Sequence, residues 1–398
     1  MSQAPAPDGP LVVLGSGYAG LTVAQEVHRR SKGKIPVVLV DRSPVHVLRT
    51  QLYEIDRIAR AEANVRPWAV PLSEILDSTS VSYRAGTVRS IDLAQRTVEL
   101  DSGSLAFRSL AICLGNVPAY YGVPGAEANT HSVYRLSAAQ RLGRRLREIE
   151  AASPKLAGER RPRIIVVGGG STGTELSAEI ATADWTSVAH PQARAPEVVL
   201  LTGTLPFLDG LPPRLVEHAR RMLHEAGVAI VYGWNVVRVD ADRLELDDGT
   251  VLVFDAAIWC AGLQAAPLIR ELPVPHGHGG RIAVDEHLEI PGFPRCFAVG
   301  DVIEYRDPST GLTVPGTAQA ALAEARVAAE NLVARWSGQP LAPFHYRERG
   351  TIVAVGQGRG AGNLGRLTLW GRPAALVKKL VQRDYSNAVE KGETSRVL

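Results

Sequence analysis

Two glycine-rich segments of one pattern are the residues of this 398-residue chain best suited to chemistry. Each reads Gly-x-Gly-x-x-Gly, directly after an apolar run and directly before a predicted helix. The glycines allow a tight turn and a close approach to a pyrophosphate, and the helix directs the positive end of its dipole at the phosphates. Two such segments predict two bound dinucleotides, a pair whose usual chemistry is hydride transfer from a nicotinamide to a flavin. The predicted contacts are Gly15, Gly17, Tyr18, Ala19 and Gly20 in the first segment and Gly168, Gly170, Ser171, Thr172 and Gly173 in the second.

An acidic residue about twenty positions beyond the last glycine is where such a unit holds a ribose hydroxyl. In the first unit Asp41 closes the predicted strand 36–40 and is our candidate, with Arg42 beside it; a plain strand-end acid is the alternative. In the second unit Thr202 stands in place of the acid. Without that carboxylate a 2'-phosphate is no longer repelled, and no adjacent arginine would attract it. The sequence therefore leaves the choice between NADH and NADPH open.

Composition places the chain among globular proteins, with 45% hydrophobic and 21% charged residues and a net charge of +3. That charge is too small to indicate nucleic-acid binding. Cys113, Cys260 and Cys296 are far apart in mostly apolar surroundings, so we expect buried thiols and neither a disulfide nor a metal site. The first ten residues lack the features of a signal peptide, and no run of eighteen apolar residues occurs, which predicts a cytoplasmic protein.

The elements around the two fingerprints predict an α/β fold with two similar halves. In each half a fingerprint strand and helix, a second strand, a hairpin and a buried strand follow in the same order, and an internal duplication is the simplest account. A basic helix with exposed arginines, a polar linker, a short strand and a long helix are also expected. In chain order these predictions are helix 21–30, a hairpin at 101–103, strand 110–115, helix 137–152, linker 154–162, strand 197–201, a hairpin at 247–249, strand 256–262, strand 295–301 and helix 317–336.

Four blocks resemble the two-dinucleotide-binding flavoprotein reductases: the two fingerprints, the segment 111–115 in place of the family's A-T-G block, and the segment 297–301. Within that group the chain looks like a type II NADH:quinone oxidoreductase, the single-subunit enzyme that pumps no protons, through segments 52–55, 168–179 and 315–319. The resemblance covers residues 10 to about 340. It implies two Rossmann-like, doubly wound domains, FAD as cofactor, NADH or NADPH as substrate, and a quinone acceptor.

The resemblance also assigns roles to single residues. Asp301 would hold the ribityl hydroxyls of the flavin. The helix that opens near Thr317, with Ala318 and Gln319 in its first turn, would point its N-terminus at the pyrimidine edge, where flavin reduction places negative charge. Alternatively, Gln319 is only a polar first-turn residue. The remaining predicted cofactor contacts, at the ends of the two buried strands, are Leu114, Gly115, Ala261 and Gly262.

Glu175, in the first turn of the second fingerprint helix, has two interpretations. The resemblance places it near the nicotinamide and the quinone, whereas an acid at this position also stabilises a helix without any catalytic role. Glu179 lies one turn further on and faces the same way, and it could be a plain helix-face acid. No protein nucleophile or metal is expected, because in hydride transfer the cofactor carries the chemistry.

We predict an FAD-binding domain in two parts, 10–125 and 286–342, around an NAD(P)H-binding domain, 126–285. Residues 343–398 form a separate C-terminal element with a predicted amphipathic helix over 369–385. Its apolar face would hold Pro373, Leu376, Val377, Leu380, Val381 and Tyr385, and its other face Lys378, Lys379, Gln382 and Arg383. Such a helix can lie in a membrane interface or pack on protein. The resemblance implies peripheral contact with the inner face of the cell membrane and a homodimer.

The predicted function is that of an FAD-dependent NAD(P)H:quinone oxidoreductase of a respiratory chain, working by ping-pong hydride transfer. Two alternatives stay open: a reductase that passes electrons to a ferredoxin or rubredoxin, and a nucleotide-sensing flavoprotein that acts through protein partners, which Thr202 favours. Sulfide oxidation is disfavoured because it needs a cysteine pair beside the flavin. The segment 49–53 is more polar than the corresponding family stretch and would lie beside the acceptor pocket. The sequence therefore leaves the identity of the acceptor open.

Overall fold

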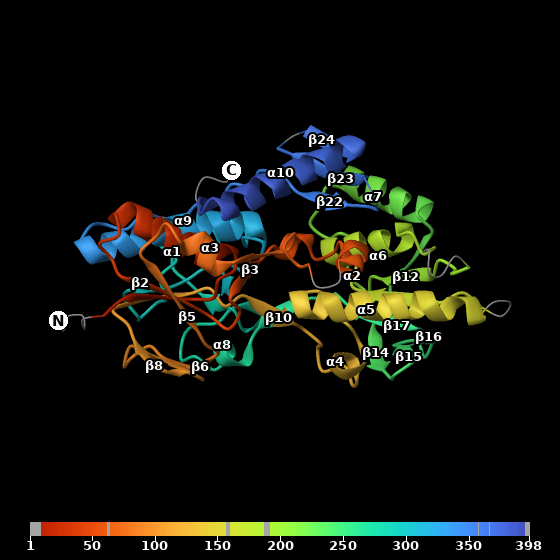
Figure 1. Ribbon diagram of the computed structural model, residues 1–398, viewed down its shortest axis with the longest axis horizontal. Coiled ribbons are helices and arrows are strands. Elements are labelled where there is room, and N and C mark those ends of the chain that lie inside the picture. The colour runs from red at the N-terminus through yellow and green to blue at the C-terminus, as the bar shows by residue number, and fades with distance from the viewer. Residues whose placement is uncertain are drawn as a thin grey trace.

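The computed structural model describes residues 9–61, 64–156, 160–186, 192–356, 358–365 and 367–394. The molecule is elongated, with its two main sheets in separate halves and the C-terminal element lying across one side of both (Figure 1). The α/β architecture predicted from the two fingerprints is confirmed, including the repeated order of elements in the two halves.

The first half is built on a five-stranded parallel sheet with the order β20-β9-β1-β2-β5. Its central strand is a short apolar run buried along its whole length, as expected for a parallel sheet covered on both faces. The long helix α9 packs against the first fingerprint helix α1. The bounds are β1 Leu11–Leu14, α1 Tyr18–Ser31, β2 Val37–Asp41, β5 Val81–Ala85, β9 Ser109–Ile112, β20 Cys296–Ala298 and α9 Ala318–Ser337.

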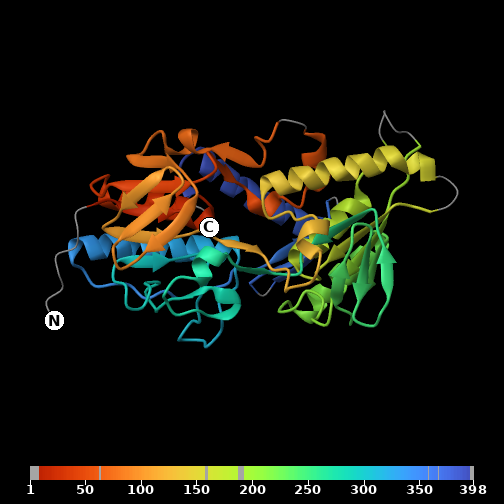
Figure 2. The same cartoon turned by 90° about the horizontal axis from the view of Figure 1, so that it is seen from below.

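The second half repeats this plan with a four-stranded parallel sheet of order β13-β12-β11-β17. Helix α5 runs along the outside of this half (Figure 2). It exposes Arg141, Arg144 and Arg147, as predicted for its charged face, whereas Arg145 is only partly exposed and donates to the Asp255 carbonyl. The bounds are α5 Leu136–Ala152, β11 Arg163–Val167, α6 Ser171–Thr182, β12 Glu197–Leu201, α7 Pro213–Glu225, β13 Val228–Val231 and β17 Ala256–Trp259.

Each half also carries a small antiparallel sheet, and both predicted hairpins are confirmed: Leu100 pairs with Gly103, and β15 pairs with β16. The two halves are joined by β10 and β18, which pair antiparallel. The bounds are β6 Val88–Asp92, β7 Thr97–Leu100, β8 Gly103–Ala106, β10 Asn116–Pro118, β14 Val236–Val239, β15 Arg243–Leu246, β16 Val251–Val253 and β18 Leu263–Ala265.

Shorter elements fill the connections. They are β3 Val45–Val47, η1 Arg49–Gln51, α2 Ile55–Arg60, β4 Ala69–Pro71, α3 Leu72–Leu76, α4 Ala126–Asn129, η2 Ser153–Leu156, α8 Pro267–Arg270, η3 His278–Gly280, β19 Ile282–Ala283 and β21 Ile303–Glu304. Residues 157–159 of the predicted linker lie outside the described residues.

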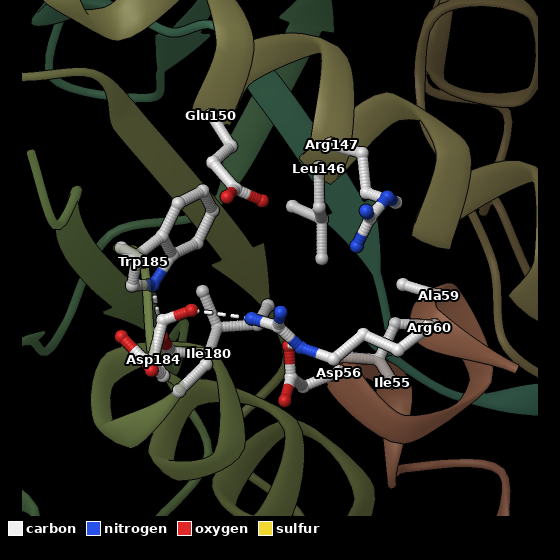
Figure 3. A pocket seen from close by; sticks show the side chains of 11 residues that line it. Ile55, Asp56, Ala59, Arg60, Leu146, Arg147, Glu150, Ile180, Asp184 and Trp185 are labelled. Atoms are coloured by element: carbon white, nitrogen blue, oxygen red, sulfur yellow. Dashed lines mark hydrogen bonds and ion pairs between the residues drawn. The ribbon is translucent and has the colours of Figure 1, made fainter. Parts of the chain in front are cut away.

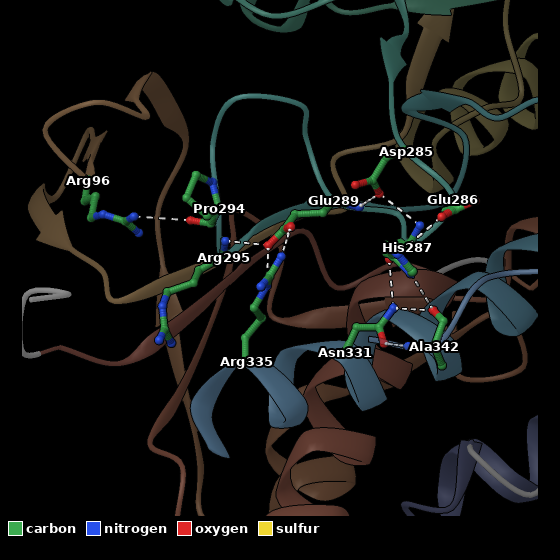
Figure 4. Close-up of polar contacts among 10 residues, drawn as sticks. All are labelled: Arg96, Asp285, Glu286, His287, Glu289, Pro294, Arg295, Asn331, Arg335 and Ala342. Atoms are coloured by element: carbon green, nitrogen blue, oxygen red, sulfur yellow. Dashed lines mark hydrogen bonds and ion pairs between the residues drawn. The ribbon is translucent and has the colours of Figure 1, made fainter. Parts of the chain in front are cut away.

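The segment before β20 is fixed to α9 by buried polar contacts (Figure 4). Glu289 accepts a hydrogen bond of 2.7 Å from the Arg295 amide and forms an ion pair with Arg335. Asn331 donates to the carbonyls of His287 and Ala342, at 2.9 Å each, and accepts the Ala342 amide at 2.7 Å. These contacts fix the C-terminal part of α9 against the segment that leads into β20.

The C-terminal element contacts both halves. Its sheet places Val353, Val355 and Ala361 in the core of the second half, whereas Tyr385 and Val389 of its helix belong to the core of the first. The bounds are β22 Ile352–Ala354, β23 Gly360–Leu364, β24 Leu367–Gly371 and α10 Arg372–Glu390. The predicted C-terminal helix is therefore confirmed, with its start three residues later and its end five residues later.

The predicted faces of α10 are wrong in part. Leu376, Leu380 and Val381 are exposed by 59%, 55% and 55%, whereas Tyr385 is buried and Lys378 points into the protein. Buried polar partners explain this orientation, because an inward lysine and tyrosine are tolerated where each meets a partner. No helix in the described part of the chain is both long and apolar enough to cross a membrane.

Candidate active site

The first glycine cradle has the geometry expected of a pyrophosphate site. Gly15 has φ +98°, and a Cβ on it would lie 2.5 Å from the Cys113 carbonyl oxygen, while a Cβ on Gly20 would strike the Gly15 carbonyl. At Gly17, by contrast, an added Cβ would meet no atom of the described residues within 4 Å. Two glycines are thus required by packing, and the third leaves open space before the N-terminus of α1, which fits the phosphates of a dinucleotide.

The second cradle repeats these features. Gly168 has φ +119° and lies against the Cys260 carbonyl, and Gly173 lies against the carbonyl of Gly168. Gly170 again faces open space among the described atoms, directly before the first residue of α6. The residues of both cradles therefore fit a dinucleotide.

Asp41 lies beside the first cradle, at the end of β2. One carboxylate oxygen accepts the Ser16 amide at 2.7 Å and the Ser16 hydroxyl at 2.9 Å, and the other accepts the Ser43 amide at 2.9 Å. Asp41 therefore holds the loop of the cradle in place. An ionised carboxylate can accept about four hydrogen bonds, so capacity for a ribose hydroxyl is left, and that role stays a prediction.

Positive charge gathers near the same cradle. Burial lowers the pKa of Arg135, and the nearby charges of Arg42 and Arg49 lower it further. The Nη1 atom of Arg49 lies 3.3 Å from where a Cβ on Gly115 would stand. Such a group of arginines suits a diphosphate, whose oxygens accept their hydrogen bonds. From the sequence, Arg49 was notable only because segment 49–53 differs from the family pattern, and no cofactor contact was predicted for this residue.

Asp301 and the start of α9 are adjacent, as predicted. Thr317 caps α9 by accepting the Ala320 amide at 3.2 Å, so the helix begins at Ala318. A Cβ on Gly316, just before the cap, would lie 3.5 Å from Asp301 Oδ1. Gln319 donates from Nε2 to the Tyr346 hydroxyl at 2.8 Å. The roles of Asp301 and Gln319 toward a flavin remain predictions.

Tyr134 is a residue that the sequence reasoning missed. Burial raises its pKa, and its neighbours come from both halves: Thr172 of the second cradle bonds to it, while the charges of Arg49 and Asp301 act on it. It thus lies among groups of both halves: Thr172 and Cys260 of the second, and Arg49 and Asp301 of the first. It belongs to no motif, so only the folded chain reveals it.

Glu175 is joined to the C-terminal helix. Its Oε1 forms an ion pair with Lys378 Nζ and accepts the Ala354 amide at 3.0 Å, and the side chains of the pair are only 11% and 13% exposed. Lys378 Nζ also lies 4.6 Å from the centre of the Tyr53 ring. Burial, then the charge of Glu175, raises the pKa of Tyr53, which stays a neutral phenol. This assembly offers an ammonium donor, a carboxylate and an aromatic face to a planar substrate with polar oxygens.

A second acidic group lies next to this assembly. Glu54 accepts the Trp68 indole N–H at 3.3 Å and forms an ion pair with Arg57. Burial raises the pKa of Glu54. Burial and, after it, the nearby charge of Glu54 raise the pKa of Glu179 to about 7. Glu179 is buried, at 8% exposed, on the same helix as Glu175.

The C-terminal helix also reaches the first cradle. His46 is fully buried, and its Nδ1 donates to the Ser16 carbonyl at 2.7 Å, while its Nε2 accepts the Tyr385 hydroxyl at 3.1 Å. Burial lowers the pKa of His46 to about 4, so the ring is neutral. The Tyr385 ring stacks on Tyr18, with centres 4.6 Å apart. Helix α10 therefore helps to hold the loop that precedes α1.

Thr202 ends β12, where the second unit was predicted to lack its ribose acid. Its hydroxyl lies 3.3 Å from the Val231 carbonyl and 3.4 Å from the Gly203 carbonyl, and its side chain packs against Gly169. The residue is 7% exposed. Its hydroxyl is thus engaged by the backbone and does not replace a carboxylate.

All three cysteines are buried and free, as predicted. Burial raises the pKa values of Cys260 and Cys296 to about 12 and also raises that of Cys113, so the thiols stay protonated. Protonated, buried thiols are poor nucleophiles. Redox chemistry at this site therefore depends on a cofactor and not on cysteine.

Comparisons with known proteins agree with this geometry. Residues 9–325 match the model of a family described as pyridine nucleotide-disulphide oxidoreductase. The chain is 29% identical over 385 residues to the demethylphylloquinone reductase NdbB of Synechocystis, covering 93% of this chain and 90% of that protein. It is 25% identical to the type II NADH:quinone oxidoreductase of Staphylococcus aureus, covering 93% of each. The solved structure of NDH2 from Plasmodium falciparum in complex with NADH has the same fold, with a TM-score of 0.83 at 15% identity and 98% of each chain covered.

Proposed function

Because the chain belongs to the pyridine nucleotide-disulphide oxidoreductase family, we propose that it is an FAD-dependent NADH:quinone oxidoreductase of the type II kind. The observation that carries the proposal is the buried Glu175–Lys378 pair beneath Tyr53, next to the second cradle. The names of the Synechocystis and Staphylococcus relatives, a quinone reductase and an NADH:quinone oxidoreductase, support it.

The first cradle would hold FAD through Gly17, Asp41 and the arginines near it, with Asp301 and the N-terminus of α9 at the flavin. Bound FAD supplies the two-electron chemistry between nicotinamide and quinone. The second cradle would hold NADH, and NADPH is expected to be accepted as well, since no carboxylate stands at position 202.

The protein's own contribution is to orient the quinone and to supply a proton. Tyr53 would give the quinone ring a flat surface to stack on. Lys378 would donate a hydrogen bond and then a proton to the quinone oxygen, while the Glu175 carboxylate, its ion-pair partner, would hold its Nζ in place.

Anaerobic stopped-flow spectroscopy of the purified yellow protein tests this function. We expect NADH to bleach the flavin and a quinone to restore its colour. If neither nucleotide bleaches the flavin, the proposal is refuted. If ferredoxin or rubredoxin restores the colour and quinones do not, the protein is instead a reductase of small iron proteins.

Membrane contact through α10 is part of the proposal, because a lipid-soluble acceptor must be reached. Leu367, Trp370, Leu376 and Leu380 are each at least half exposed on β24 and α10, with Arg372, Lys379 and Arg383 exposed among them. An exposed apolar surface with basic neighbours suits an anionic lipid surface. We place the protein on the inner face of the cell membrane.

The variant Leu376→Ser/Leu380→Ser tests this contact by co-sedimentation with phosphatidylglycerol vesicles. We expect it to bind less than the wild type, whereas the control Leu205→Ser, a residue 69% exposed on the second half, should bind normally. Unchanged binding would refute the membrane contact. Loss of a dimer in light scattering, without loss of vesicle binding, would assign this surface to a homodimer.

We propose a division of the chain into FAD-binding, nucleotide-binding and C-terminal parts close to the predicted one. Ala126 packs in the core of the second half, and Ala265, Ile269 and Leu272 already pack in that of the first. We therefore propose that the chain passes from the nucleotide-binding domain back to the FAD-binding domain near β18. Limited proteolysis followed by mass spectrometry would locate the boundary.

A further inference from the structure

Glu179 is a buried carboxyl group that the mechanism above leaves without a role. It follows Glu175 by four residues on α6, so the two side chains lie on the same face, with their Cβ atoms about 6 Å apart. Both residues are at most 9% exposed. The charged groups that act on Glu179 come from two other segments of the chain: Glu54, Asp56 and Arg57 around the start of α2, and Lys379 on α10.

We propose that Glu179, together with Glu54, stores the second proton of quinone reduction and delivers it to the Glu175–Lys378 pair. The inference rests on the proposed function and extends it, because it names the route by which the pair is reprotonated. Glu179 acts through Glu175 and does not itself touch the quinone.

The chemistry balances with one stored proton. Reduction of a quinone to its quinol takes two electrons and two protons, and a hydride supplies both electrons and one proton. The other proton comes from Lys378: an O–H bond forms on the quinone, and an N–H bond of the ammonium breaks. The O–H bond of protonated Glu179 then breaks, and its proton passes by way of Glu175 to the amine of Lys378. Glu179 is left as a carboxylate and regains a proton from water.

The electrostatics of Glu179 suit this role. Burial and the nearby charges of Glu54 and Asp56 raise its pKa to about 7, against the smaller opposing effects of Arg57 and Lys379. The group is therefore about half protonated at neutral pH, the condition in which an acid both gives and regains a proton most readily. Glu54 has a raised pKa as well and lies between Tyr53 and the indole of Trp68.

A route to solvent lies next to these groups. A small hollow of about 20 Å³, partly open to solvent, lies between α2, α5 and the end of α6 (Figure 3). Asp56, which acts on Glu179, lines it on one side, and Ile180, the residue after Glu179, lines it on another. Across the hollow, Glu150 Oε1 is buried and has no hydrogen-bond partner in the described part of the chain. An acceptor aimed into a hollow with room for water would hold water there.

The kinetic test separates the two half-reactions by stopped flow. In Glu179→Gln, flavin reduction by NADH should proceed at the wild-type rate. Reoxidation by a quinone should slow about tenfold below pH 7 and lose its pH dependence. The matched control is Glu217→Gln, an exposed acid on α7 far from the site, which should change neither half-reaction.

A milder variant keeps the idea testable even if Glu179→Gln folds poorly. Because the charge of Glu54 raises the pKa of Glu179, Glu54→Gln should move the midpoint of the reoxidation profile to lower pH. Infrared titration gives a readout independent of turnover: the protonated-carboxyl band near neutral pH should lose one group in Glu179→Gln. A Glu179→Gln enzyme that keeps both the wild-type midpoint and this band would refute the relay. A wild type that no quinone reoxidises would instead refute the proposed function.

Discussion

Replacing Lys378 by methionine should be among the most damaging single changes in the C-terminal helix. Methionine keeps most of the apolar stem but removes the charge, leaving the Glu175 carboxylate buried with the Ala354 amide as its hydrogen-bond donor. Breaking a buried ion pair costs roughly 3–5 kcal/mol, and loss of the contact with the Tyr53 ring adds to this. Because the pair is slightly exposed, we expect a loss of about 3 kcal/mol in the free energy of unfolding at neutral pH.

Urea denaturation followed by circular dichroism measures this loss. The matched control is Lys379→Met, one residue further on and exposed, which should cost less than about 0.5 kcal/mol. The double variant Lys378→Met/Glu175→Gln should be more stable than Lys378→Met alone, because it removes the unpaired charge. A cost below about 1 kcal/mol, with no recovery in the double variant, would show that the pair does not form in solution.

Three further predictions concern other parts of the site. Tyr385→Phe leaves buried His46 Nε2 without its hydrogen-bond donor, so it should lower the free energy of unfolding by about 1–2 kcal/mol in urea denaturation. It should also weaken FAD retention, measured by flavin absorbance after gel filtration. Unchanged retention would show that α10 does not support the first cradle. Thr202→Asp restores a ribose acceptor and should raise the NADH to NADPH ratio of kcat/KM at least about tenfold, and an unchanged ratio would place the ribose elsewhere. Glu324, fully buried, has its pKa raised to about 7, so its contribution to stability is complete below its ordinary pKa and is lost as pH rises through about 7. Glu324→Gln should keep the hydrogen bond from the Gly300 amide, and near pH 8 its free energy of unfolding should exceed that of the wild type by about 3 kcal/mol. If the free energies of unfolding of the two proteins change with pH in the same way, the raised pKa is contradicted.

The nucleotide cradles could be predicted from the sequence because their chemistry is local. Each needs a strand, a turn with three glycines and a helix within about ten residues, and both turns have the expected geometry at Gly15 and Gly168. The end of β2 and the start of α9 were each predicted to within one residue for the same reason, because short signals along the chain mark both.

The contacts of the proposed acceptor side could not be predicted in this way, because they join residues far apart in the chain. Glu175 and Lys378 are 203 positions apart, and His46 and Tyr385 are 339 apart. The periodicity of α10 predicted a helix correctly but gave the wrong side to Lys378 and Tyr385. A hydrophobic pattern shows which residues are apolar. Whether a polar residue is buried depends on whether the interior offers it a hydrogen-bond or ion-pair partner.

The orientation of α10 links its surface to the site. Leu376 and Leu380 point outward from the same helix that sends Lys378 inward, within one turn of one another. A helix that rested on lipid through these leucines would hold the Lys378 ammonium a single helix diameter, about 10 Å, from the membrane surface. A quinone leaving the bilayer would then need to pass only this helix to reach Tyr53. With Leu376 and Leu380 outward and Lys378 inward, α10 has the arrangement that the proposed membrane contact would need if the same helix is also to complete a polar site beneath it.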